Sequence, residues 1–260
     1  MKRKPKVYFR KFGIELEFST PLKEAQKSIK KIISKIYHKN KLIVSDVSSS
    51  SSTGYKKWEL KFDGSTECEL TTPISTPHSF KRITQVIDEL SLGNLKLTNN
   101  DSVHIHMQAD DVPKHNIIAA WILIEKTILK CFPTHRRDNG YCQKLVAKKY
   151  KKISDFFIDA EIEANAHHAI VSLNYYSQRK TVEFRMMEGN KNSNDILSWI
   201  KFCMTFLNYA KTIDPIEIVC DKEKPKLNIE ELIQLLSIKD KEVINFLTRR
   251  EARFKNQVSQ

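Results

Sequence analysis

Five segments of this chain alternate apolar side chains with acidic, histidine or arginine side chains. They are residues 13–18, 58–62, 68–71, 103–107 and 181–186. Successive side chains of a β-strand point to opposite faces, so each segment predicts a strand with one apolar face. If the strands pair, the other face collects Glu15, Glu17, Glu69, His104, His106, Glu183 and Arg185. Crowded carboxylates repel one another unless cations lie among them, so this pattern is typical of a metal and phosphate site.

Turn signals and helical spacing between these segments predict an α+β fold. The Asp63-Gly64-Ser65 turn joins residues 55–62 and 67–72 in a hairpin, and residues 170–176 and 180–187 predict a second one. Helices are expected over residues 20–38, 78–92, 113–129 and 192–211, with a helical stretch over 142–150. We expect a largely antiparallel, curved sheet with helices packed on one face. After Asp214-Pro215, two short helices form a C-terminal appendage, residues 214–260.

The composition restricts how this chain can bind an anion. It has only six glycines, and neither a G-x-G-x-x-G fingerprint nor a phosphate-binding P-loop occurs, so metal ions and side chains would have to hold any nucleotide. Lysine and arginine total 44 against 31 acidic residues, a net charge of +13. This charge is compatible with an anionic partner such as ATP, an acidic polymer or nucleic acid, but it does not by itself establish one. A solvated, lysine-rich surface explains the same charge, because the lysines are scattered.

Cysteine usage and hydropathy indicate a cytoplasmic protein with reduced thiols. The five cysteines form no C-x-x-C pair, and no apolar run reaches the ~18 residues of a membrane span. The residues after Met1 contain no apolar signal core. We therefore expect no membrane partner.

Two short motifs carry the expected metal ligands. The carboxylates of Glu15 and Glu17 point the same way on a strand, about 7 Å apart along the backbone, which suits hard cations with oxygen ligands. Alone, such a pair is more often a solvated strand face. Of the imidazoles on residues 104 and 106, we take His106 as a ligand and leave His104 beside the ligands or in a structural role. One imidazole among carboxylates fits Mg²⁺ or Mn²⁺ better than a closed zinc site.

The order of the motifs resembles the amidoligase family of carboxylate–amine ligases, relatives of glutamate–cysteine ligase with a glutamine-synthetase-like fold. The resemblance covers about residues 7–210 and rests on Gly13-Ile-Glu-Leu-Glu17, Trp58 with Asp63-Gly64-Ser65, Glu69-Leu-Thr-Thr-Pro73, His104-Ile-His106, Arg136-Arg-Asp-Asn139-Gly-Tyr141-Cys142, Asn174 and Thr181-Val-Glu-Phe-Arg185. It makes residues 1–213 the catalytic domain. Two departures concern substrate geometry: Asn100-Asp101-Ser102 stands where the family often has a glycine, and Glu188-Gly189-Asn190 where Gly-Thr is usual.

The resemblance also implies roles for individual residues. Metal ligands are Glu15, Glu17, Glu69, His106 and Glu183, which would hold Mg²⁺ or Mn²⁺ against ATP. Arg185 would engage the transferred phosphate, while one of Arg136 and Arg137 would act on phosphate or the carboxylate substrate. His104, Asn139 and Tyr141 join Arg185 in cofactor binding, and the Asp63–Ser65 turn is mainly structural.

The activity implied is amide-bond formation, in which ATP phosphorylates a substrate carboxylate and an amine displaces phosphate. Glu59 or Asp63 is the candidate base for the amine. Two alternatives stay open: a phosphotransferase of the same fold, and a non-catalytic basic protein that binds nucleic acid or acts as a scaffold. The basic charge favours a large acidic acceptor such as a peptide or polymer. Phages and mobile elements often encode the family, which favours a viral role. An oligomer is compatible with each of these functions.

Overall fold

The computed structural model describes residues 9–37, 42–45, 56–62, 66–137, 139–145, 169–220 and 226–257. The strands are β1 (Phe12–Phe18), β2 (Leu42–Ser45), β3 (Trp58–Lys61), β4 (Cys68–Thr71), β5 (Ser102–Gln108), β6 (Val171–Ser172) and β7 (Thr181–Glu188). The helices are α1 (Leu22–Tyr37), α2 (Phe80–Ser91), α3 (Lys114–Ile128), α5 (Tyr176–Arg179), α6 (Ser193–Ala210), α7 (Pro215–Cys220), α8 (Ile229–Leu235) and α9 (Lys241–Phe254). Short 3-10 turns lie at η1 (Pro77–Ser79), η2 (Leu129–Cys131) and η3 (Thr134–Arg136).

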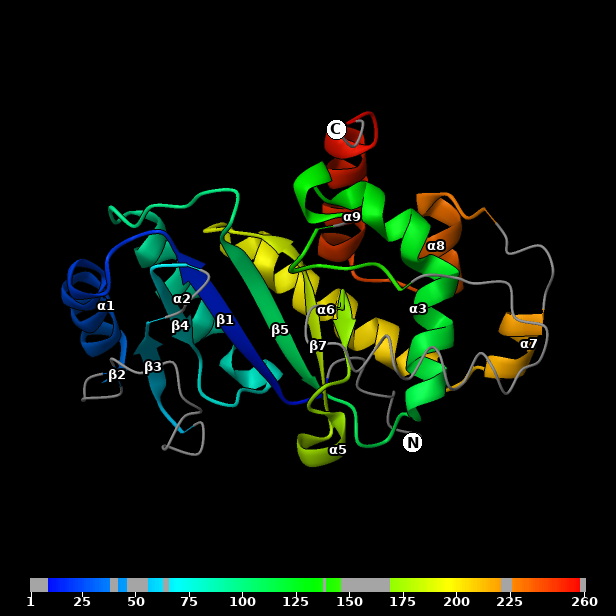
Figure 1. Ribbon diagram of the computed structural model, residues 1–260, viewed down its shortest axis with the longest axis horizontal. Coiled ribbons are helices and arrows are strands. Elements are labelled where there is room, and N and C mark those ends of the chain that lie inside the picture. The colour runs from blue at the N-terminus through cyan, green and yellow to red at the C-terminus, as the bar shows by residue number, and fades with distance from the viewer. Residues whose placement is uncertain are drawn as a thin grey trace. The chain divides into compact units, whose positions relative to one another are not determined.

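Hydrogen bonds order the strands β2-β3-β4-β1-β5-β7-β6 in one sheet (Figure 1). β4 pairs antiparallel with both β1 and β3, β6 pairs antiparallel with β7, and β2 pairs parallel with β3. The predicted α+β class with a mostly antiparallel sheet is therefore confirmed. The glutamine-synthetase-like form of that sheet stays a prediction.

The chain forms two compact units, each described here by itself. The N-terminal unit comprises residues 9–106 and 187–197, and the C-terminal unit comprises the described residues of 107–186 and 198–257. β5 and β7 each run from one unit into the other. A backbone hydrogen bond joins the residues beside these two strands within each unit. In the N-terminal unit, Gly189 N–H donates to the Asp101 carbonyl at 2.7 Å. In the C-terminal unit, Ala109 N–H donates to the Lys180 carbonyl at 2.8 Å.

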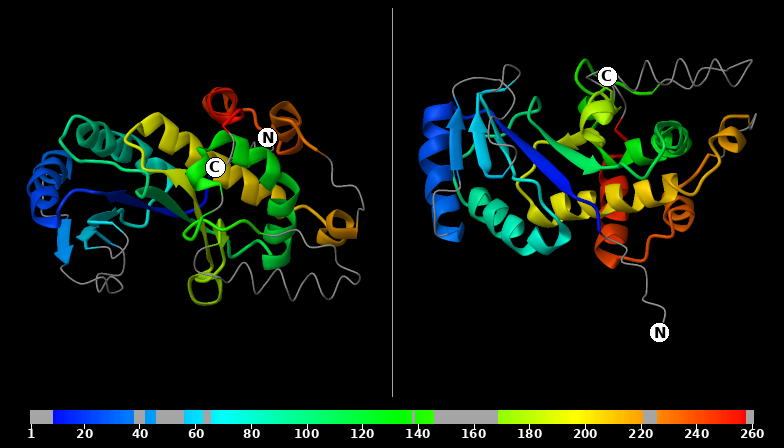
Figure 2. Two further views of the ribbon diagram at one scale, coloured as in Figure 1. Left: turned by 45° about the horizontal axis from the view of Figure 1, so that its top comes forward. Right: turned by 90° about the horizontal axis from the view of Figure 1, so that it is seen from below.

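The core of the N-terminal unit follows from the period-2 alternation. The apolar members of β1, β3, β4 and β5 are all buried: Ile14, Leu16, Phe18, Leu60, Leu70, Val103 and Ile105. Helix α2 adds a buried stripe at helical spacing, with Ile83, Val86, Ile87 and Leu90. Figure 2 shows α2 on one side of β1. The charged members of the same strands are thereby confined to the other face.

An aromatic cluster fixes β7 in the C-terminal unit. The Phe184 ring lies edge-on to the rings of Trp199 and Phe206, with centroids 6.3 Å and 5.8 Å away, and Trp121 of α3 contacts Phe206 at 5.4 Å. Edge-to-face pairs at these separations are favourable beyond the area they bury. Because Phe184 lies between Glu183 and Arg185 in the strand, anchoring its ring directs both charged neighbours to the opposite face.

Several expected elements are confirmed and three are corrected. Helices α1, α2, α3 and α6 and the pairing β3–β4 lie where the sequence predicts them. β6 pairs with β7 as predicted, but the strand expected over 170–176 covers only Val171–Ser172, and α5 begins at Tyr176. The helix expected over 142–150 is wrong for residues 142–145, since Cys142 and Gln143 form isolated β-bridges with Asn139 and Ala169. Residues 146–150 and the Asp63–Ser65 turn lie outside the described residues. After Pro215 the described chain holds α7, α8 and α9, not two short helices. The proposed boundary after residue 213 stays a prediction.

No helix in the described ranges is both long and apolar enough to span a membrane.

Candidate metal and phosphate site

The strand register aligns charged residues in rows across the N-terminal unit. Glu15 on β1 and Glu59 on β3 both lie opposite Thr71 of β4. In the next row, two residues away, Glu17 and Lys61 both lie opposite Glu69. Residues directly opposite on antiparallel strands have Cβ atoms about 5 Å apart, so these side chains interact across the strands. The predicted collection of Glu15, Glu17 and Glu69 on one face is present in this unit.

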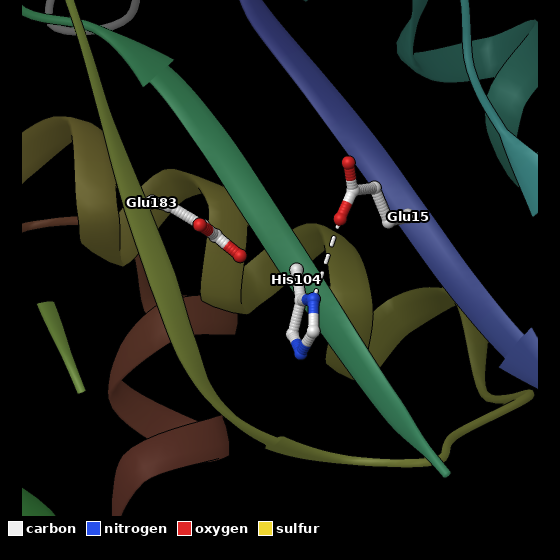
Figure 3. A group of neighbouring side chains, drawn as sticks. All are labelled: Glu15, His104 and Glu183. Carbon is white, nitrogen blue, oxygen red and sulfur yellow. Dashed lines mark hydrogen bonds and ion pairs between the residues drawn. The ribbon is translucent and has the colours of Figure 1, made fainter. Parts of the chain in front are cut away.

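Both imidazoles of β5 contact the carboxylate of Glu15. His104 Nδ1 lies 3.3 Å from Glu15 Oε2, and His106 Nε2 lies 3.0 Å from Glu15 Oε1. Figure 3 shows the His104 ring directed at Glu15, with the contact drawn as a dashed line. Burial alone would raise the pKa of Glu15, but His106 and His104 lower it by more, so that pKa lies well below its usual value. Glu15 is therefore an anion held between two imidazoles.

Ser102 connects Glu17 to His104. Its hydroxyl donates to Glu17 Oε2 at 2.5 Å and lies 2.7 Å from His104 Nε2. Both Glu17 and His104 are buried. Sequence reasoning missed Ser102, although its place two residues before His104 puts it on the same strand face. The Ser102 hydroxyl thus helps to orient both the Glu17 carboxylate and the His104 imidazole.

Glu69 is held by Lys61 and Thr71. Lys61 Nζ lies 3.0 Å from Glu69 Oε1, and the Thr71 hydroxyl donates to the same oxygen at 2.9 Å. Burial, and then the charge of Glu15, raise the pKa of Glu69 to about 8, although Lys61 and Thr71 oppose the shift. Burial alone would lower the pKa of Lys61. The charges of Glu69, Glu15 and Glu59 raise it by more, so the pKa lies above its usual value. The positive charge of Lys61 therefore does not neutralise the carboxylates of this face.

Glu183 and Arg185 form a buried ion pair on β7 of the C-terminal unit. Arg185 Nη1 contacts Glu183 Oε1, and Arg185 Nε donates to the Tyr141 carbonyl at 3.1 Å. Arg136, only 2% exposed, donates from Nη2 to the Arg185 carbonyl. Among the described residues no acceptor lies within reach of Arg136 Nε. The Glu183–Arg185 pair is thus held in place, and Arg136 binds the backbone of Arg185.

The loop that contains the other predicted residues is held by its own hydrogen bonds. Asn139 Nδ2 donates to the His135 carbonyl, and Asn139 Oδ1 accepts from Tyr141 N–H at 2.7 Å. The Tyr141 side chain is exposed. Arg137 points elsewhere, with all three guanidinium nitrogens donating to carbonyls of Phe132, Phe254 and Gln257. Of the two candidate arginines, only Arg136 contacts the strand of Glu183 and Arg185 in the part of the chain that the structure describes.

The fold and these side chains define the class of this protein: a mixed α+β chain whose strands carry carboxylates, imidazoles and Arg185. Residues 9–207 match the model of a family described as "putative amidoligase enzyme", and the chain belongs to that family. The resemblance inferred from the motif order is thereby confirmed, and the family description is that of a ligase. A search of curated proteins found no match.

Proposed function

We propose that this protein is an ATP-dependent carboxylate–amine ligase that forms an amide through an acyl phosphate. The observation that carries the proposal is the group of carboxylates Glu15, Glu17 and Glu69, which share one face of β1 and β4. Burial, and then the charge of Glu15, raise the pKa of Glu69 to about 8 even beside Lys61. A divalent cation would relieve the repulsion among these carboxylates. Membership of the amidoligase family supports the ligase reading.

The donor chemistry of the sheet fits Mg²⁺ or Mn²⁺. Glu15, His104 and Glu183 offer two carboxylates and one imidazole, the mixed oxygen and nitrogen set that these ions accept. Glu183 is part of the proposal because it belongs to the ligand set predicted from the sequence. The predicted ligand set was Glu15, Glu17, Glu69, His106 and Glu183, and His104 was expected beside the ligands or in a structural role. A bound ion would supply charge neutralisation at the ATP phosphates.

The arginines would stabilise the phosphoryl group as it moves. Arg185 uses Nε and Nη1 in bonds to Tyr141 and Glu183, which leaves Nη2 unbonded among the described residues and available to a phosphate oxygen. Its two existing bonds orient the guanidinium in advance, so little rearrangement is needed when charge develops. Arg136 holds the Arg185 backbone and offers its Nε–H. Asn139 and Tyr141 stay predicted nucleotide contacts.

The reaction needs no covalent intermediate on the protein. A substrate carboxylate oxygen would attack the γ-phosphorus of ATP and release ADP. The amine nitrogen would then attack the acyl carbon, expel phosphate and lose a proton to a base. Glu59 is buried on the same face and lies outside the predicted ligand set, which makes it the candidate base among the described residues.

Product analysis tests the proposal. The protein is incubated with Mg²⁺, ATP and pooled carboxylates and amines, including amino acids and acidic peptides, and ADP and AMP are measured. ADP and phosphate released only when both substrate pools are present support the ligase. A stable phosphorylated product without amine indicates the phosphotransferase alternative, and AMP with pyrophosphate excludes the acyl-phosphate route. No turnover, together with no effect of Mg²⁺ and ATP on melting, favours the non-catalytic alternative.

A further inference from the structure

The segment after the family-matched residues packs closely on the C-terminal unit. Helix α9, residues 241–254, lies entirely beyond residue 207, where the family match ends. Its buried residues include Phe246, Leu247 and Phe254. Cys131 Sγ donates to the Leu247 carbonyl at 3.5 Å, which joins η2 to the middle of α9. The helix is therefore part of the packed unit, although it lies outside the matched region.

Arg250 anchors the middle of α9. Its side chain is 1% exposed, and its guanidinium carbon lies 5.0 Å from the ring centroids of both Phe132 and Phe254 and 5.3 Å from that of Phe246. Arg250 Nε donates to the Cys131 carbonyl at 2.8 Å. Cation–π contacts strengthen when the cation is desolvated, so this residue fixes α9 against Phe132. Phe132 lies five residues before Arg137, which makes the next contact with the helix.

Arg137 binds the C-terminal end of α9. Nη1 donates to the Gln257 carbonyl at 2.9 Å, Nη2 donates to the Phe254 carbonyl, and Nε donates to the Phe132 carbonyl at 2.9 Å. The last carbonyls of a helix have no partner within the helix and carry partial negative charge, which a guanidinium satisfies. These contacts join positions 117 and 120 residues apart in the chain.

The residue next to Arg137 acts on the strand of the proposed site. Arg136 and Arg137 are held together by the 3-10 turn η3, whose Pro133 and Thr134 carbonyls accept from their backbone N–H groups at 2.9 Å and 3.0 Å. Arg136 donates to the Arg185 carbonyl, and Cys142 Sγ donates to the same oxygen at 3.6 Å. One rigid turn thus connects the end of α9 to the backbone of Arg185.

We propose that α9 is a positioning element for Arg185, acting through Arg137 and then Arg136. The position of α9 would determine the position of η3. The turn would then fix the carbonyl of Arg185 and hence the position of its guanidinium. The coupling between α9 and Arg185 follows from these contacts alone, whereas its effect on catalysis rests on the proposed function. The C-terminal segment would then be required for activity although it lies outside the family-matched residues.

Cys142 is a native reporter of this coupling. The test compares native-state alkylation of each cysteine, resolved by peptide mass spectrometry, in the full-length protein and in Arg137→Ala. Cys142 should react about tenfold faster in the variant, because local opening becomes easier once the three donated hydrogen bonds are lost. Cys68 on β4 and Cys203 on α6 are buried but belong to other elements, and they should keep their rates. Lys255→Ala removes an exposed charge from the same helix end and should change nothing.

Each outcome decides the proposal. An unchanged Cys142 rate in Arg137→Ala overturns the coupling. If all the cysteines react faster, the variant has lost global stability, and Arg137→Lys is then compared; a uniform rise there also overturns the proposal, whereas a rise confined to Cys142 and Cys131 supports it. In the ADP-release assay, Arg137→Ala should lower kcat about tenfold with little change in the KM for ATP. A wild-type protein without ATP turnover would refute the proposed function and leave the alkylation result standing.

Discussion

Glu15 and Glu69 are neighbouring carboxylates on one sheet face, yet their environments shift their affinities for protons in opposite directions. Two imidazoles lower the pKa of Glu15 despite its burial, while burial and Glu15 itself raise the pKa of Glu69 to about 8. Such divergence between adjacent acids is frequent at functional sites, because each acid is prepared for a different task. Here it leaves Glu69 as the carboxylate with the most to gain from a cation.

The raised pKa of Glu69 predicts a pH dependence of stability in the metal-free protein. A carboxyl whose folded-state pKa exceeds its unfolded value near 4.5 stabilises the fold below that value, and this contribution is lost as pH rises toward about 8. The free energy of unfolding, measured by urea titration from pH 5 to 9, should therefore fall more in wild type than in Glu69→Gln. The difference should exceed about 1 kcal/mol, since one pKa unit corresponds to about 1.4 kcal/mol.

Glu67→Gln supplies the matched control for this titration. Glu67 is exposed and lies two residues before Glu69, so its removal should leave the pH profile parallel to that of wild type. Parallel profiles for wild type and Glu69→Gln would contradict the raised pKa.

The Glu183–Arg185 pair predicts a separation between metal binding and turnover. Glu183→Gln removes a proposed charged oxygen ligand and should weaken Mn²⁺ binding, measured by electron paramagnetic resonance. Arg185→Lys keeps a positive charge beside buried Glu183 but loses the planar fork, so Mn²⁺ affinity should stay close to wild type while ADP release falls by about 10². Replacement by alanine is less informative, because it leaves Glu183 buried without its partner.

Arg179→Ala, at an exposed arginine just before β7, is the control for Arg185→Lys and should preserve turnover. If Glu183 and Arg185 only stabilise the sheet, both of their variants would shift the melting temperature slightly and leave any ADP release unchanged.

At the scale of elements, period-2 alternation predicts the five strands β1, β3, β4, β5 and β7 and the face that their charged residues occupy. Glu15, Glu17, His104 and His106 lie on one face of β1 and β5 because Ile14, Leu16 and Ile105 must be buried. The register across β3, β4 and β1 could not be predicted, since it depends on pairing between strands far apart in the sequence. The Lys61–Glu69 contact is a consequence of that register.

Long-range contacts also explain where the prediction of elements was wrong. The apolar spacing around Cys142 and Leu145 favoured a helix, but Leu145 N–H donates to Glu125 Oε1 at 2.9 Å and the Gln143 carbonyl accepts from Ile170 N–H at 2.8 Å. These tertiary bonds override a weak local propensity. Likewise, nothing in the sequence around Arg137 indicates a partner at Phe254, so its role on α9 was accessible only from the fold.

The chain after β7 depends on Gly189, which packs against Asp101, the residue before β5. A Cβ at Gly189 would lie 2.8 Å from Asp101 Cβ and 3.2 Å from the Asp101 carbonyl oxygen. Asp101 is fully buried and accepts from the Ser19 hydroxyl at 2.9 Å, so it cannot move aside freely. Gly189→Ala should lower the free energy of unfolding by about 1–3 kcal/mol, measured by urea denaturation. Gly140→Ala, where a Cβ would meet nothing within 4 Å, is the control, and an equal effect of both variants would refute the packing argument.

At the scale of the whole molecule, the proposed ligands come from both compact units. Glu17 belongs to the N-terminal unit and Glu183 to the C-terminal unit, while β5 and β7 run through both. The net charge of +13 favours an anion such as ATP but does not say where it binds. The decisive question for the proposed function is whether the two units act on the same ion.

Melting experiments with single and double variants answer that question. Millimolar Mg²⁺ with ATP should raise the melting temperature of wild type by about 5 °C, because a ligand that binds only the folded state stabilises it by mass action. Glu17→Gln or Glu183→Gln alone should remove most of this shift, each measured against its own ligand-free melting temperature. The double variant should then lose little more, since an ion that needs both carboxylates is already lost when one of them is replaced. Losses that simply add would indicate independent sites, and a full shift in either single variant would exclude that residue from the site.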